Sequence, residues 1–281
     1  MIKKILQRAK SIIHVVKPNY YEATFPYTFQ CRNGQEITVS PIPESRAAEA
    51  MYVLADIFTK QAPLCFPFKI PIELTHQRFI KALEYASNPM VSIYATDPYG
   101  KIVGVHLNDE TLLDNSKNQG KKFIDTKLMD HYTLFDKCEN MCIDHYKQKN
   151  FKGKILRFYS GGVADGMKGY GILSYMAWAS LAVAKSHGYD EVIVEASNKG
   201  SQKTIKMLGF KEIARLKYNE YFVINEQGER TYPFAEVDAL TTQKANRLNK
   251  FGKKWSSYAP DCMVMASSID NALARAKANL F

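Results

Sequence analysis

The stretch "GGVADGMKGYGILSYM", residues 161–176, decides the fold. The segment that leads into it, "ILRFYSGGV" (155–163), reads as a strand, and the apolar segment that follows, "LSYMAWASLAVAKSHG" (173–188), reads as a helix. The first N–H groups of a helix have no partner within the helix, and the helix dipole places partial positive charge there. A strand-to-helix turn with so few side chains is therefore a natural anion site.

This turn differs from the common nucleotide-binding loops. It contains neither G-x-x-x-x-G-K-[ST] nor G-x-G-x-x-G. Gly169 and Gly171 would let backbone amides approach a bulky anion without a Cβ in the way, and Lys168 adds a positive charge. Taken alone, the spacing also fits a corner that is rich in glycine for packing.

The rest of the middle of the chain alternates strands and helices. "QEITVSPIP" reads as a strand, residues 44–61 as a helix, and residues 90–109 as two strands around an Asp-Pro-Tyr-Gly turn. A helical stretch near 126–147 precedes a strand, helix, strand, helix, strand series from residue 154 to 218. Such alternation indicates crossover connections, so we expect an α/β (α+β) fold with a mixed, partly parallel sheet.

The composition is that of a globular protein without a nucleic-acid footprint. The 281 residues are 46% hydrophobic and 23% charged, and no apolar run reaches the length of a transmembrane helix. The net charge is +10, of which residues 1–35 carry +5 and residues 236–281 carry +3, so the middle is nearly neutral and we expect no nucleic-acid partner. Five cysteines, an odd number, fit a reducing compartment, and we expect a cytoplasmic protein.

The first 17 residues predict a basic amphipathic helix. We favour a helix packed on the body of the protein. Peripheral contact with an anionic membrane surface and a mitochondrial presequence remain alternatives. At the other end, residues 236–281 predict an appendage covering the surface, with a terminal helix that starts near Ser268 or Asp270. Docking of a partner or a lipid is the alternative there.

Two motifs resemble the GNAT acetyltransferases. "VADGMKGYGIL", from Val163, resembles their pyrophosphate loop, [RQ]-x-x-G-x-[GA] preceded by valine, and "NKGSQKTIKMLGFKEI", from Asn198, resembles their second signature. The resemblance implies a GNAT fold and acetyl-CoA as co-substrate. It divides the chain into an N-terminal extension (1–35), an acetyltransferase domain (36–235) and a C-terminal extension (236–281).

Further segments resemble the insect and nematode arylalkylamine N-acetyltransferases. They are "GKIVGVHLND", "LMDH", "GKILRFYSGGV" and the "SNKGS" ahead of "KMLGF". This resemblance implies transfer of an acetyl group to a small, aromatic primary amine. It also implies that the strand at 155–163 separates from its neighbour and holds the thioester, and that the loop amides bind the pyrophosphate. The implied cofactor-binding residues are Gly162, Val163, Lys168, Gly169, Tyr170, Gly171, Ile172, Leu173 and Asn198.

The resemblance places the catalytic pair of serines on Ser197 and Ser201, near the expected position of the sulfur. Four residues apart, both hydroxyls would lie on one side of the first helical turn. The alternative is that Ser197 only caps the helix and Ser201 only packs.

The sequence departs from this family at its base. Where the family has the glutamate of Glu-Pro-Leu, this chain has Ala62 in "QAPL". Asp56 or Glu49 could act through water, the amine could arrive neutral, or the protein could bind an acyl-CoA without turning over amines. Lys168 replaces an arginine and loses its fork geometry, and Leu173 replaces a small residue.

By the same resemblance, the acceptor pocket lies between the loop after residues 45–60 and residues 109–150, with Phe66 and Phe68 as aromatic walls. We expect no metal. Cys138, Cys142 and His145 share one helical face, but no fourth ligand is evident. The sequence does not indicate an oligomeric state.

Overall fold

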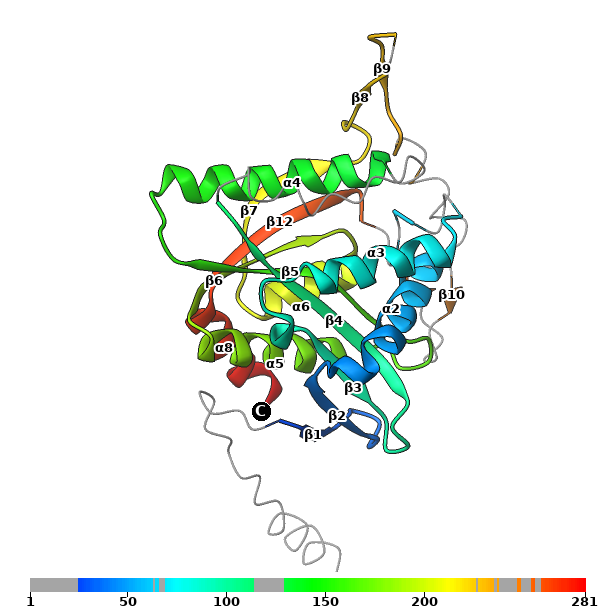
Figure 1. Cartoon of the computed structure of the whole chain (residues 1–281), viewed down its shortest axis with the longest axis vertical. Coiled ribbons are helices and arrows are strands. Elements are labelled where there is room, and N and C mark those ends of the chain that lie inside the picture. Colours follow the sequence, from blue (N-terminus) through cyan, green and yellow to red (C-terminus); the bar gives the residue numbers. More distant parts are fainter. Residues whose placement is uncertain are drawn as a thin grey trace, which may run out of the picture.

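Eight strands form one sheet in the computed structural model, which describes residues 25–62, 64–65, 69–113, 129–225, 227–234, 237, 247–248, 254–255 and 259–281. Their order across the sheet is β1-β2-β3-β4-β5-β6-β12-β7 (Figure 1). β5 and β6 pair in parallel, and the other neighbouring strands of this sheet pair antiparallel. The expected mixed sheet is therefore confirmed. The strands are β1 Tyr27–Gln30, β2 Glu36–Pro41, β3 Ile93–Thr96, β4 Ile102–Thr111, β5 Lys154–Val163, β6 Tyr189–Ala196, β7 Lys211–Lys217 and β12 Asp261–Ser268.

Helices cover both faces of the sheet (Figure 1). They are α2 Ala47–Gln61, α3 Ile72–Glu84, α4 Met129–Gln148, α5 Ile172–Ser186, α6 Lys199–Met207 and α8 Ile269–Leu280. Short 3-10 turns occupy Glu44–Arg46 and Pro89–Val91. Two small hairpins stand apart from the main sheet, namely β8 Val223–Ile224 with β9 Arg230–Thr231, and β10 Arg247–Leu248 with β11 Lys254–Trp255.

The alternation of side chains along β4 shows which helices lie on which face. A Cβ at Gly104 would meet the Met176 side chain of α5, which belongs to the buried cluster that also holds α8 residues and Ile205 of α6. The next residue, Val105, packs in the cluster of α2 and α3. Successive residues of a strand point to opposite faces. One face therefore carries α5, α6 and α8. The other carries α2 and α3, with α4 over the β6-β12-β7 half.

Helix α5 is buried on almost every side. The Trp178 side chain is fully buried, and eleven of the fifteen residues of α5 are buried. A helix that is apolar all round belongs in a protein interior. This position fixes the glycine-rich turn at its N-terminus firmly against the sheet.

The structure corrects the expected role of the C-terminal segment. We expected residues 236–281 to cover the surface, but β12 lies inside the sheet, between β6 and β7. The strand was not recognised because its residues are buried on both faces and show no two-residue alternation. The terminal helix α8 is confirmed, with Ser268 as its N-cap. The domain boundaries at 36 and 235 stay predictions.

In the part of the chain that the structure describes, no helix has the length and apolar character needed to cross a membrane. All five cysteines are buried and form no disulfide. The amphipathic helix expected at residues 1–17 lies outside the described residues.

Candidate active site

The parallel pair β5–β6 opens near its middle. The last paired residues are Phe158 and Val194. Beyond them β5 continues to Val163 beside β4, while β6 continues to Ala196 beside β12. The extra residue of a β-bulge, Tyr159, falls at this point. The expected separation of the two strands is therefore present.

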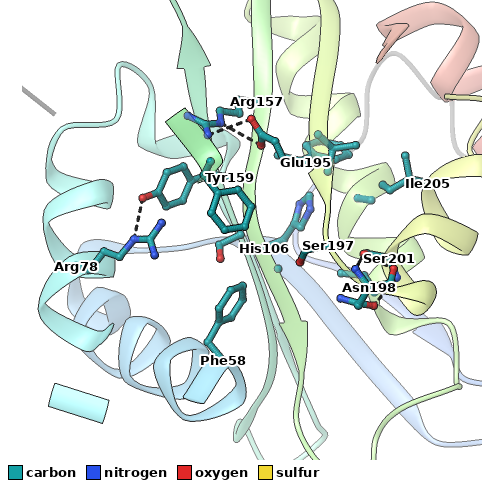
Figure 2. A pocket seen from close by; sticks show the side chains of 17 residues that line it. Phe58, Arg78, His106, Arg157, Tyr159, Glu195, Ser197, Asn198, Ser201 and Ile205 are labelled. Atoms are coloured by element: carbon teal, nitrogen blue, oxygen red, sulfur yellow. Dashed lines mark hydrogen bonds and ion pairs between the residues drawn. The ribbon is translucent and has the colours of Figure 1, made fainter. Parts of the chain in front are cut away.

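A cavity occupies the opening and is lined from both faces of the sheet (Figure 2). The face of α2, α3 and α4 contributes Phe58, Arg78, Phe135, Arg157, Tyr159, Ser160 and Glu195. The face of α5 and α6 contributes His106, Phe158, Gly161, Leu173, Ala177, Val194 and Ile205. Ser197, Asn198 and Ser201 line it at the end of β6. Two molecules that approach from opposite faces could meet there.

The glycine-rich turn joins the end of β5 to the start of α5. Gly169 and Gly171 have φ values of +82° and +90°, in the left-handed region that favours glycine. Within the described residues, no hydrogen bond engages the backbone N–H groups of Gly169, Gly171, Ile172 or Leu173. Four donors at the positive end of a helix dipole thus have no hydrogen-bond partner among the described residues.

The other predicted residues of this corner lie where the sequence placed them. Gly162 and Val163 end β5, Lys168 and Tyr170 lie in the turn, and Leu173 is in the first turn of α5 and lines the cavity. The Lys168 ammonium lies 3.2 Å from the Asp165 carboxylate, and both side chains are partly exposed.

Asn198, not Ser197, caps α6. The Asn198 side-chain oxygen accepts a hydrogen bond from the Ser201 N–H at 2.9 Å, and the Ser201 hydroxyl donates to the Asn198 C=O at 2.9 Å. This capping box fixes the first turn of the helix. The reading of Ser197 as the cap and of Ser201 as a packing residue is therefore wrong. Both serines line the cavity, but their catalytic role stays a prediction.

Ala62 and the two acids considered as substitute bases lie away from this lining. Ala62 ends α2, where its N–H donates to the Phe58 C=O. The Glu49 carboxylate pairs with Arg46, and the Asp56 carboxylate pairs with Lys60. None of the three residues lines the cavity.

Sequence reasoning missed a charged cluster in the wall formed by β5, β6 and α4. The Arg157 guanidinium lies 2.7 Å from a Glu139 oxygen and 3.0 Å from a Glu195 oxygen. Burial alone would lower the pKa of Arg157, but the two carboxylates outweigh it and raise that pKa well above its usual value. Charged residues within otherwise apolar strands were the signal that could have revealed the cluster.

The remaining polar groups of the cavity come from three elements. The Arg78 Nε donates to the Tyr159 hydroxyl at 3.1 Å (Figure 2). Behind the cavity lining, the phenyl rings of Phe58 and Phe79 meet edge to face. His106 is fully buried, and burial lowers its pKa to about 3, so its ring is neutral. The expected aromatic walls Phe66 and Phe68 lie outside the described residues, whereas Phe58 and Phe135 do line the cavity.

Comparison of the whole fold finds acetyltransferases. A protein assigned as arylalkylamine N-acetyltransferase 7 of the yellow fever mosquito superposes with a TM-score of 0.65 at 17% identity, over 89% of this chain and 98% of that one. Arylalkylamine N-acetyltransferase 2 of Aedes aegypti gives 0.61 at 21% identity, over 83% and 99%. The C-terminal condensation domain of Ebony, solved with beta-alanyl-dopamine, gives 0.64 at 16% identity, over 83% and 99%.

No protein-family model matches the sequence, and a search of curated proteins finds no match either. The fold is therefore the feature shared with those proteins, and this chain also has the separation of β5 from β6 and the turn before α5 that its motifs implied. The chain has the fold of the GNAT N-acetyltransferases, as its motifs predicted.

Proposed function

We propose that the protein transfers an acetyl group from acetyl-CoA to a small, aromatic primary amine by direct attack on the thioester. The observation that carries this proposal is the cavity through the separated strands. One side of it is lined by Leu173, in the first turn of α5, and the other by aromatic side chains.

The turn fits the diphosphate of coenzyme A. The unpaired N–H groups of Gly169, Gly171, Ile172 and Leu173 would supply donors, and Lys168 would supply charge. A Cβ on Gly169 would meet no other atom within 4 Å, so the space beside this residue is open. Acetyl-CoA bound there would supply the activated acyl group. The backbone of Gly162 and Val163, with the Asn198 amide, would hold its arm.

The acceptor side suits an aromatic amine. Phe58, Phe135 and Tyr159 line this side of the cavity. Such rings bind a flat apolar group well. Similar folds are named as acting on arylalkylamines, one was solved with beta-alanyl-dopamine, and one is described as forming N-acetylagmatine. An aliphatic amine is thus the competing acceptor.

Ser197 and Ser201 are the proposed hydroxyls near the leaving thiolate. Both line the cavity at the start of α6. Acyl transfer needs a proton for the departing sulfur. The Ser201 hydroxyl donates to the Asn198 C=O, so it would have to turn toward the sulfur to act.

Ala62 favours one other function, an acyl-CoA-binding protein that turns over amines weakly or not at all. Alanine cannot take the proton that the family's glutamate takes. We also propose a cytoplasmic location, with contact of residues 1–17 with a membrane surface or a mitochondrial location as the alternatives.

Two measurements test the proposal together. Calorimetry with acetyl-CoA measures binding, and thiol release is followed over a panel of tryptamine, phenylethylamine, agmatine and a diamine. Binding with thiol release that is fastest for the aromatic amines supports the proposal. Binding without release for any amine supports the alternative, and no binding refutes both.

A further inference from the structure

The cluster of Arg157, Glu139 and Glu195 in the acceptor-side wall carries two negative charges against one positive charge, and Arg78 lies elsewhere in the same lining. The Arg157 guanidinium contacts the carboxylates of both Glu139 and Glu195. The Glu195 side chain is 2% exposed and that of Arg157 is 10% exposed, so water screens the excess charge poorly. A buried net charge is costly unless something compensates for it. A cationic acceptor would provide that compensation.

Glu195 occupies the apex of the opening. It follows Val194, the last residue of β6 that pairs with β5, and lies two residues before Ser197. Its backbone is held by Val264 of β12. Figure 2 shows the Glu195 carboxylate beside Arg157 in the wall of the cavity.

One oxygen of Glu195 is not used by a hydrogen bond. Oε2 accepts from Arg157 Nε at 3.3 Å. Oε1 is buried and lies 3.0 Å from Arg157 Nη2 without the alignment of a hydrogen bond. Among the described residues it has no other partner, so it can accept a proton from a bound molecule.

The surroundings of Glu195 make it a stronger base than an exposed glutamate. Burial raises its pKa, the Arg157 guanidinium opposes this, and the Glu139 charge adds to it. Cys142 of α4 and Cys262 of β12 also face it. Burial raises the pKa of the Cys142 thiol, and a hydrogen bond with Cys138 together with burial raises that of Cys262, so both stay neutral.

The other groups of the lining are weaker candidates for a base. Among the described residues that line the cavity, Glu195 is the one carboxylate. His106 remains neutral to about pH 3, so its ring holds a proton too weakly to deprotonate an ammonium group. Arg78 and Arg157 carry positive charge and accept no proton.

We propose that Glu195 binds the ammonium group of the acceptor and removes its proton, with Arg157 and Glu139 as positioning residues. The inference rests on the proposed acetyl transfer. Glu195 takes one proton, the amine nitrogen then forms a C–N bond to the thioester carbon, and the C–S bond breaks. The second proton lost by nitrogen goes to the thiolate sulfur, and Glu195 returns the first to water.

The test compares the pH dependence of kcat/KM for thiol release in the wild type and in Glu195→Gln. The substitution leaves Arg157 paired one to one with Glu139, so the cluster becomes neutral and the variant should fold. We expect at least a ~100-fold loss of kcat/KM. We also expect the acid limb of the profile to be replaced by a continuous rise toward the pKa of the amine. For trifluoroethylamine, which is unprotonated at the assay pH, the loss should nearly vanish.

Two further variants separate catalysis from structure. Glu139→Gln should move the acid limb to lower pH, because Arg157 then stabilises the Glu195 charge alone. Glu191→Gln is the matched control, since Glu191 lies on the same strand, accepts a hydrogen bond from the Tyr146 hydroxyl and does not line the cavity. It should leave the profile unchanged.

The outcomes distinguish the two proposals. No thiol release by the wild type with any amine overturns the acetyl-transfer function and this inference with it. An active wild type whose rate and pH profile survive Glu195→Gln, with unchanged melting temperature and acetyl-CoA affinity, overturns the role of Glu195 alone. A loss of equal size for trifluoroethylamine and for tryptamine also overturns it.

Discussion

The His106 imidazole and the Ser180 hydroxyl join β4 to α5 beneath the cavity, with Nδ1 and Oγ 2.9 Å apart. The Ser180 hydroxyl donates to the Met176 C=O, and the Asn108 amide donates to the Ser180 oxygen. The network is buried, and burial lowers the pKa of His106 to about 3. A neutral histidine is therefore part of the folded state.

This histidine should make stability depend on pH. The pKa of His106 is lower in the folded state than its unfolded value of about 6.5. The neutral histidine therefore adds its full share to the unfolding free energy above pH 6.5, and this share is lost as the pH falls toward 3. We expect His106→Gln to flatten the fall in unfolding free energy between pH 6.5 and 4, measured by urea titration. The exposed His187 provides the control, and His187→Gln should leave the slope unchanged. Equal slopes for the wild type and His106→Gln would contradict this account.

A close approach between β5 and α2 should make Gly162 intolerant of a side chain. A Cβ at Gly162 would lie 2.5 Å from Ile57 Cγ2. We expect Gly162→Ala to cost about 1–3 kcal/mol of unfolding free energy. Ile57→Ala removes the clashing methyl group, so the double variant should be more stable than the sum of the single effects predicts. Additive effects in a double-mutant cycle would show that the two elements move apart instead.

Two glycines of the turn provide a matched pair for cofactor binding. Gly166 and Gly169 have φ values of +84° and +82°, and a Cβ on either would contact no atom within 4 Å. Alanine at either position should cost a similar ~1–2 kcal/mol of stability, from backbone strain. Gly169→Ala should also weaken coenzyme A binding about tenfold. The added Cβ would keep the diphosphate away from the amide, which costs about one hydrogen bond to a charged group. Calorimetry with both variants checks this, and equal affinities would remove Gly169 from the site.

The aromatic walls should select the acceptor. Phe58→Ala or Phe135→Ala should raise KM for tryptamine about 2- to 10-fold, because one aromatic contact contributes that much to binding. KM for agmatine should change less. Tyr52→Ala on the exposed side of α2 is the control, because Tyr52 is 52% exposed and does not line the cavity. Equal changes for both amines would show that these rings only support the fold.

Local patterns in the sequence predicted the elements whose signals are local. The helical spacing of apolar residues such as Met51, Leu54 and Ala55 predicted α2, and the Asp-Pro-Tyr-Gly turn predicted the β3–β4 hairpin. The glycines before Ile172 gave the turn that opens α5. In each case one helix face or one turn type carries the information.

Elements defined by distant contacts were harder to predict. Helix α3 was not predicted, and its buried residues, Thr75 and Phe79, are few because it packs mainly on α2. The N-cap of α6 is Asn198 because Asn198 and Ser201 form the reciprocal hydrogen bonds of a capping box. Glu195 was not recognised as a site residue, since its charged contacts are with Arg157, 38 residues earlier, which also pairs with Glu139 of α4.

The central claim is that this turn and cavity hold coenzyme A for acyl transfer, and a crystal structure of the chain with coenzyme A and tryptamine tests it most directly. We predict that the diphosphate accepts hydrogen bonds from the amides of residues 169–173. We also predict that the sulfur lies between β5 and β6 and that the amine faces Glu195. A diphosphate bound elsewhere, or an opening between the strands that no ligand enters, would contradict the account.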